Sequence, residues 1–190
     1  MGKLKVVVLA LVLVLAAGCS QKDDTNKPGT EKPDTTVSFD DMTTDMKEAI
    51  AEDLKEGGVE EEVLVDNKLT YYLETDLTAA EEEDPAVAIW LEKMGLDQAN
   101  ITKGLVIAAM MNVNADEIIV LEAKDEADVA ALKESLENEL ENQDNTWKQY
   151  LPDQYEKVED NIIATNGKYL LYVTYSNPDK IEEIFNSYTK

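Results

Sequence analysis

Apolar residues recur with helical spacing in some segments of this chain and with strand spacing in others, and their order predicts a mixed fold. Between residues 39 and 56 an apolar side chain returns every four positions, at Met42, Met46, Ile50 and Leu54. This spacing places the four side chains on one helix face, and Gly57-Gly58 directly afterwards is typical of a helix end. We therefore predict a helix over Phe39–Glu56.

The segment that follows carries weaker signals. Two short apolar runs, Val63–Val65 and Leu69–Leu73, flank Asp66-Asn67-Lys68 and predict a β-hairpin. Asp84 is then expected to cap a helix whose first residue is Pro85. This helix would run through Ile89, Trp90 and Leu91 to Met94, with Gly95 at its end.

The strongest strand pattern lies in the middle of the chain. Leu105–Val113 is apolar at both alternating sets of positions, which is typical of a central strand. Asn114-Ala115-Asp116 predicts a turn, and Ile118–Lys124 predicts the next strand.

Asp125 is expected to cap a long helix. Its apolar face comprises Val129, Leu132, Leu136 and Leu140. We expect the helix to reach Trp147 or Tyr150, and Pro152 to end the segment.

The C-terminal segment repeats the same order of elements. Asn161–Thr165 and Lys168–Tyr175 predict two strands, and the Asn166-Gly167 dipeptide between them favours a type I′ hairpin turn. Asn177 and Pro178 then predict the start of a last helix. One face of that helix comprises Ile181, Ile184, Phe185 and Tyr188.

These elements predict the α+β class. We expect a two-layer sandwich, with an antiparallel sheet of four or more strands and helices on one face. The order β-β-α occurs twice in the second half, which allows for an internal repeat that matches Ile118–Lys124 with Tyr169–Tyr175. A parallel doubly wound sheet is disfavoured, because the strands come in hairpin pairs.

The N-terminus carries the three parts of a secretory signal. Lys3 and Lys5 precede the apolar run Val6–Ala17, and Gly18-Cys19 follows it. This looks like a bacterial lipobox, which predicts cleavage after Gly18 and lipid attachment to Cys19. The run is shorter than the roughly 20 residues of a membrane-spanning helix. A transmembrane anchor and an ordinary signal peptide remain the alternatives.

The chain is therefore expected to have three parts. Residues 1–18 form a lipoprotein signal peptide, residues 19–37 form the lipidated cysteine and a disordered tether, and residues 38–190 form one α+β domain. The tether contains no large apolar residue before Val37, so it cannot bury enough surface to fold. This organisation predicts a protein anchored by lipid at the outer face of the bacterial cytoplasmic membrane.

Composition removes several classes of chemistry. The formal net charge is −24, and the chain contains no His. Every one of its 17 basic residues is Lys. A surface this acidic repels nucleic acid and anionic lipid head groups. Without His, the Ser-His-Asp and Cys-His nucleophilic systems are excluded, and so is a conventional zinc site once Cys19 is acylated. We expect no bound cofactor and no metal site.

Carboxylates are the remaining candidates for chemistry. The densest run is Glu81-Glu82-Glu83-Asp84, but it lacks the alternating spacing of a calcium loop. It precedes Pro85 and is expected to charge the start of a helix. A pair of carboxylates acting as acid and base leaves no spacing signature, so a small hydrolase is not excluded by residue type.

Aromatic side chains offer a candidate surface. Tyr169, Leu171, Val173 and Tyr175 share one face of a predicted strand, and Leu170, Tyr172 and Thr174 share the other. We expect these side chains, like Trp90 and Trp147, to belong to the core. A sheet face left uncovered by helices would instead present tyrosines to a protein or a glycan.

Three blocks of residues are similar to a known family. They are Asn112-Val113 with Ala115–Ile118 and Glu122–Asp125, then Tyr150-Leu151-Pro152 with Gln154-Tyr155, then Gly167–Tyr169 with Leu171 and Val173. Over about Leu105 to Lys190 the chain resembles an uncharacterised family of Gram-positive bacterial lipoproteins, classed as a domain of unknown function. Gly57 to Thr102 departs from that pattern. The resemblance implies a secreted, lipid-anchored protein and supplies no catalytic residues.

Three functions follow as hypotheses. The first is a non-catalytic binding or structural lipoprotein with a protein or cell-wall partner. The second is a small carboxylate-dependent cell-wall hydrolase, which requires two carboxylates that converge in a cleft, one with a raised pKa. The third is a solute-binding accessory protein, although such proteins usually close two lobes around a ligand and this chain is short for two lobes.

Overall fold

A computed structural model describes residues 37–190. The predicted signal peptide, Cys19 and the tether up to residue 36 lie outside the described residues. The helices of the described part are α1 (Phe39–Glu56), α2 (Ala86–Met94), α3 (Val129–Trp147), α4 (Pro152–Glu159) and α5 (Pro178–Thr189). The strands are β1 (Leu64–Val65), β2 (Lys68–Leu69), β3 (Tyr72–Asp76), β4 (Ile101–Ala109), β5 (Glu117–Ala123), β6 (Ile162–Asn166) and β7 (Tyr169–Thr174).

Five of the strands form one antiparallel sheet in the order β3-β4-β5-β7-β6. The centre of the sheet is β5, which pairs with β4 on one side and β7 on the other. β1 and β2 form a separate two-stranded hairpin that packs near α1. The predicted α+β class and the antiparallel sheet are confirmed.

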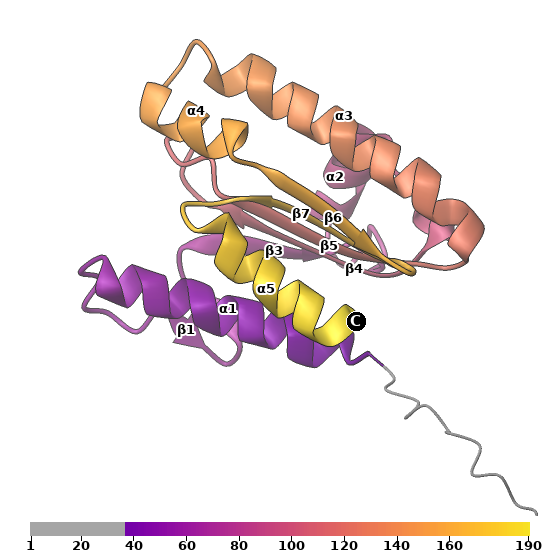
Figure 1. The fold of residues 1–190 in the computed structure, drawn as a ribbon, viewed down its shortest axis with the longest axis horizontal. Coiled ribbons are helices and arrows are strands. Elements are labelled where there is room, and N and C mark those ends of the chain that lie inside the picture. The colour runs from indigo at the N-terminus through magenta and orange to yellow at the C-terminus, as the bar shows by residue number, and fades with distance from the viewer. Residues whose placement is uncertain (1–36) are drawn as a thin grey trace, which may run out of the picture. The chain divides into compact units, whose positions relative to one another are not determined.

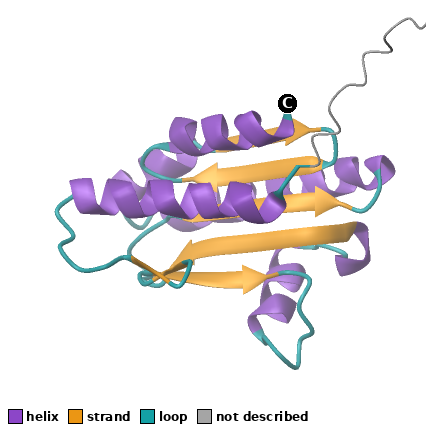
Figure 2. Ribbon diagram, turned by 90° about the horizontal axis from the view of Figure 1, so that it is seen from below, coloured by secondary structure: helices purple, strands orange, loops and turns teal. Residues whose placement is uncertain are grey.

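Helices cover both faces of the sheet (Figure 1). On one face, α1 and α5 bury Ile118 and Val120 of β5. On the other face, α2 and α3 bury Ile119 and Leu121 of the same strand. Figure 2 shows α1 and α5 lying across the first face, with the strands side by side behind them.

The expectation of helices on one face is therefore wrong, and the structure has three layers. The physical reason is visible in the central strands. β5 carries four consecutive apolar residues, Ile118 to Leu121, and β7 carries Leu170 to Val173, all with essentially no exposed surface. Successive strand residues point to opposite faces, so such runs are stable only when both faces are covered.

Several local predictions are confirmed, and the sequence explains them. α1 spans the predicted residues and is capped by Ser38, whose side chain accepts a hydrogen bond from the Asp41 amide. α2 begins one residue later than predicted, at Ala86 with Pro85 in the N-cap position, although the Asp84 carboxylate does accept a hydrogen bond from the Ala86 amide. Gly95 ends this helix with a φ of 67°, in the left-handed region that glycine adopts without strain.

Pro152 has a different role from the predicted one. α3 ends at Trp147, and Pro152 begins α4, which the sequence analysis did not predict. Proline is favoured at the first helical position because its missing N–H would have no helical partner there. The residue that ends one segment therefore also starts the next.

The prediction of a type I′ turn at Asn166-Gly167 is wrong, and a type I′ turn occurs in the β1–β2 hairpin instead. Asn166 pairs with Tyr169, so the central turn residues are Gly167 and Lys168, and of these Gly167 alone has a positive φ. That pattern is typical of a type II′ turn. Asp66 and Asn67 have φ values of 49° and 60°, the pattern of a type I′ turn.

The order β-β-α does occur twice, as β4-β5-α3 and β6-β7-α5, with α4 inserted between the two units. The matched strands β5 and β7 are direct neighbours in the sheet. However, α3 packs on one face and α5 on the other. The two units are thus not equivalent in their packing, and the idea of a structural repeat does not extend beyond the order of elements.

Candidate functional site

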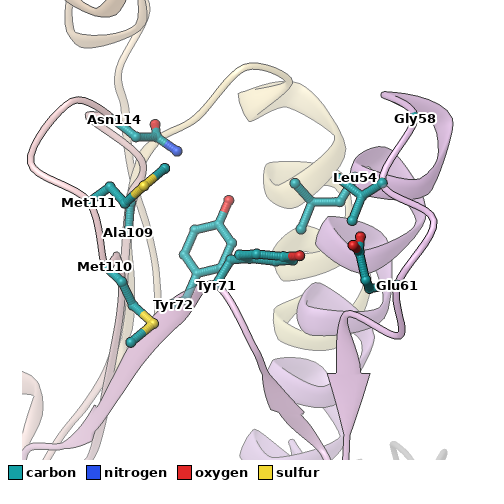
Figure 3. Close-up of a pocket in the computed structure, with 10 residues that line it drawn as sticks. Leu54, Gly58, Glu61, Tyr71, Tyr72, Ala109, Met110, Met111 and Asn114 are labelled. Carbon is teal, nitrogen blue, oxygen red and sulfur yellow. The ribbon is translucent and has the colours of Figure 1, made fainter.

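A largely apolar groove opens at one end of the sheet, where three separate segments of the chain come together (Figure 3). Its volume is about 630 Å³. The residues that line it are Leu54, Gly58, Val59, Glu61, Tyr71, Tyr72, Ala109, Met110, Met111 and Asn114. The groove is the best-formed candidate binding site in the described part of the chain.

The groove exists because the chain leaves regular structure at two places. α1 ends at Glu56 with Gly57 as its C-cap, and Gly58 continues with a φ of 95°, which turns the chain along one wall. The opposite wall is the segment after β4, where Met110 and Met111 expose 56% and 64% of their surface. Figure 3 shows the Tyr71 and Tyr72 rings between these two walls. Flexible Met side chains and aromatic rings are both typical of surfaces that bind protein segments.

A buried polar network supports the groove. The Tyr72 hydroxyl donates to Asp116 Oδ2 at 2.8 Å, and Asn114 Nδ2 donates to the same oxygen at 3.0 Å. Lys157 from α4 binds Asp116 Oδ1 at 2.6 Å, and its side chain is 18% exposed. Burial, with Asp116 next in importance, raises the pKa of Tyr72 above its usual range. Tyr72 therefore stays a neutral donor, and the Asp116 carboxylate ties β3, the β4–β5 turn and α4 together.

A second buried cluster lies on the other face of the sheet. Glu117 begins β5, and Glu139 projects from α3 toward it. Gln143 Nε2 donates to both carboxylates, at 3.1 Å and 2.8 Å, and Lys93 Nζ lies 3.5 Å from Glu117 and 2.6 Å from Glu139. The Trp147 indole donates to Gln143 Oε1 at 2.6 Å, which fixes the orientation of the amide.

The environment of Glu117 favours its neutral form. Burial first, and the neighbouring Glu139 second, raise the pKa of Glu117 to about 8, although Lys93 acts in the opposite direction. Glu117 is almost fully buried and Glu139 fully so. Two converging carboxylates, one with a raised pKa, are what the hydrolase hypothesis requires.

Access to these carboxylates is blocked. A pocket of about 420 Å³ lies next to the cluster, lined by Lys93, Asn112, Asn142, Gln143, Thr146, Trp147 and Tyr150. Neither Glu117 nor Glu139 lines it. A substrate in this pocket would meet Lys93 and Gln143 first, so the geometry does not present an acid and a base to a scissile bond.

The other sequence candidates have structural positions. Glu81 to Glu83 are exposed in the turn before α2, and they do not converge with other acidic groups: among residues 37–190 no three His, Cys, Asp or Glu side chains form a metal-binding group. Tyr172 and Tyr175 are buried on opposite faces of the sheet, so these tyrosines form no exposed platform. Trp147 packs with Ala115 and Val158, and Trp90 packs partly into the core.

Cys19, the predicted lipid attachment site, lies outside the described residues. Within residues 37–190 no helix is both long enough and apolar enough to span a membrane.

Sequence reasoning missed Glu117, Glu139 and Asp116. A signal for Glu139 was present, because it follows Leu132 by seven positions and Leu136 by three, which places a carboxylate beside the apolar face of its helix. Asp116 and Glu117 directly precede an apolar strand, which also suggested burial. The groove had no such signal, since its walls are far apart in sequence.

Comparison with known families gives one match. A family model described as "Domain of unknown function (DUF4358)" matches residues 76–175. This match starts earlier than the resemblance over Leu105 to Lys190 and ends before α5. It therefore includes residues 76–102, part of the segment Gly57 to Thr102 that was expected to depart from the family pattern. No curated protein and no solved structure matches the chain. The matched range contains the Glu117–Glu139 cluster and one wall of the groove.

Proposed function

We propose, from the premise that the chain belongs to the DUF4358 family of unknown function, that it is a membrane-anchored extracytoplasmic lipoprotein acting as a non-catalytic binding module. The anchor rests on the sequence before and at Cys19. The binding role rests on one observation, the open apolar groove of a domain whose surface is otherwise strongly acidic. A contiguous exposed apolar surface on such a protein is typical of an interaction site.

The occupant that fits the groove best is a segment of another protein. Tyr71 exposes 42% of its surface at the groove, and Met110 and Met111 expose more than half of theirs. Aromatic side chains in a partly apolar pocket are the usual anchors of protein interfaces. The polar network around Asp116 fixes two of the lining residues, Tyr72 and Asn114, relative to each other.

Anchoring is tested by replacing the predicted lipidated residue. In the native host, Cys19→Ser should abolish incorporation of labelled palmitate and release the protein from the membrane fraction. Tyr71→Ser serves as the control, because it should leave both unchanged. A Cys19→Ser variant that remains labelled would overturn the anchoring proposal.

Binding is tested on intact cells with a photoreactive amino acid at Met111. The control places the same probe at Glu137, an exposed position on α3. We expect a discrete protein adduct from position 111 alone. The adduct's purified partner should then bind the wild-type domain at least about tenfold more tightly than the Tyr71→Ser variant, a typical loss for an interface anchor. Equal adducts at both positions, or equal affinities, would contradict the proposed site.

The hydrolase is the second candidate, and the Glu117–Glu139 pair is the observation that favours it. Both carboxylates are held by Lys93 and Gln143 and are shielded from the neighbouring pocket. We therefore place this function behind the binding module. Nothing in the fold of residues 37–190 favours a solute-binding protein that closes two lobes.

A further inference from the structure

The outermost strand next to the groove has one unpaired edge. β3 pairs with β4 alone in the five-stranded sheet, and the β1–β2 hairpin belongs to a separate sheet. The hairpin contacts β3 through the Glu74 carboxylate, which accepts a hydrogen bond from the Leu69 amide at 2.8 Å. The hairpin therefore does not extend the backbone ladder.

The direction of the free backbone groups follows from the ladder. Met110 N–H donates to the Tyr71 carbonyl, and Leu77 N–H donates to the Gly104 carbonyl. The backbone N–H and C=O groups of successive residues in a strand point to alternate sides. Those of the odd-numbered residues from 71 to 77 therefore point toward β4. The N–H groups of Tyr72, Glu74 and Asp76 face outward, and among residues 37–190 none has a backbone partner.

This free edge continues directly into the groove. Tyr72 is both the first residue of β3 and a lining residue of the groove. Leu73, the next residue, exposes 55% of its surface. An extended segment that lies along β3 would thus place side chains at one end into the groove and backbone groups against the edge.

Charge decides which segment fits. Exposed Glu61 lines the groove, and its sequence neighbours Glu60 and Glu62 are also exposed. Exposed Glu81, Glu82 and Glu83 follow β3 in sequence. In the described part of the chain no Lys lines the groove. Pairing with a second copy would bring these acidic runs together, on a chain with a net charge of −24. The complementary occupant is cationic.

We propose that β3 pairs with an extended, Lys- or Arg-bearing segment of a partner protein, whose apolar side chains enter the groove. This inference rests on the proposed binding function and specifies its partner. The backbone bonds give affinity, and the alternating apolar and cationic side chains give selectivity for the groove and its acidic rim. The partner adds a sixth strand to the sheet.

The test uses a defined probe, a nine-residue peptide of alternating Lys and Val, added to the lipid-free domain. Residue-resolved amide exchange by NMR reports on the edge. At saturation the amides of Glu74 and Asp76 should exchange at least tenfold more slowly, while those of Leu73 and Thr75, already bonded to β4, should not change. The Met110 and Met111 methyl signals should shift in parallel.

Two control peptides isolate charge and strand geometry. One alternates Glu and Val, and the other has the Lys-Val composition with alternating D- and L-residues, which cannot form an ordinary strand pair. Neither should slow the Glu74 and Asp76 amides. Slowing by both Lys-Val peptides, or by the Glu-Val peptide, would overturn the inference.

Failure of this inference is distinguishable from failure of the binding function. Methyl shifts without slowed edge amides would exclude strand addition and keep the groove as a binding site. Slow, concentration-dependent exchange in the protein alone would show a second copy at the edge and overturn the inference. No response to any peptide would also overturn it, whereas the adduct at Met111 on cells tests the groove separately.

Discussion

Glu117 and Glu139 approach each other from β5 and α3 and share one ammonium group, that of Lys93. Glu117 Oε1 and Glu139 Oε2 are both buried, and among the described residues neither has a hydrogen-bond partner. Two buried carboxylates beside a single Lys leave an uncompensated negative charge, which is costly in a low-dielectric interior. A proton held by the pair removes that cost and supplies a donor.

The pair predicts a pH-dependent stability. The pKa of Glu117 rises from near 4.5 to about 8 on folding. Between these values the folded state holds a proton that the unfolded state has lost, so the free energy of unfolding should fall as pH rises. The chain has no His, so no unperturbed side chain titrates near the middle of this window.

Glu117→Gln tests this directly, because Gln is neutral at every pH and its amide can donate to Glu139. From pH 5 to pH 8.5 the variant should gain at least about 1 kcal/mol of stability relative to wild type, since one pKa unit corresponds to about 1.4 kcal/mol. Urea unfolding at several pH values measures the difference. Parallel stability curves for the two proteins would contradict the prediction.

The Asp116 network predicts an order of stability losses. Lys157→Met leaves the buried Asp116 carboxylate without its ion-pair partner and should cost about 3 kcal/mol or more. Tyr72→Phe removes one hydrogen bond and leaves the other partners of Asp116, so it should cost about 1 to 2 kcal/mol. Chemical denaturation measures both.

Lys133→Met is the matched control for the Asp116 network, because Lys133 pairs with Glu137 on the exposed side of α3. It should change stability little, since exposed ion pairs contribute little. A loss for Lys157→Met no larger than that for Lys133→Met would show that Asp116 does not need its partner.

The hydrolase hypothesis gives a sharp expectation. Neither Glu117 nor Glu139 lines the neighbouring pocket. Purified protein should therefore release no more soluble product from cell-wall polymer than an equal amount of the Glu117→Gln variant. Chromatography of the soluble fraction measures the products. Turnover that Glu117→Gln or Glu139→Gln abolishes, while Asp153→Asn retains it, would overturn the binding module in favour of an enzyme.

The helices were largely predictable because their signals are local. The four-residue spacing from Met42 to Leu54, with Gly57 at its end, specified α1. The three-layer arrangement was not predicted, although the sequence contained a signal for it. Ile118 to Leu121 and Leu170 to Val173 are continuous apolar runs, and such runs in an antiparallel sheet require helices on both faces. α4 was missed because Pro152 was interpreted as a helix end and not as a helix start.

The groove was not predictable, for a physical reason. Its walls come from the end of α1, the start of β3 and the β4–β5 turn, and they meet through the register of β3 with β4. Periodicity reports which face of one element is buried, but it does not report which two elements leave a gap between them. The Tyr72–Asp116 bond joins residues that are 44 positions apart, beyond any local pattern.

The two hairpin turns predict opposite responses to the same pair of substitutions. Asn67 has a φ of 60°, whereas Asn166 does not have a positive φ. Left-handed backbone costs roughly 1 kcal/mol or more for a residue with a Cβ and little for Gly. At position 67 the Gly variant should therefore be more stable than the Ala variant by about 1 kcal/mol. At position 166, Gly should be less stable than Ala by about 0.5 to 1 kcal/mol.

The comparison of Gly with Ala at one position cancels the loss of the asparagine side chain, which at Asn67 includes its hydrogen bond to Thr44. Urea unfolding of the four variants gives the two differences. The sign reversal is the informative result, because it depends on backbone conformation and not on side-chain contacts. The same sign at both positions would contradict the assignment of a positive φ to Asn67 and a negative φ to Asn166.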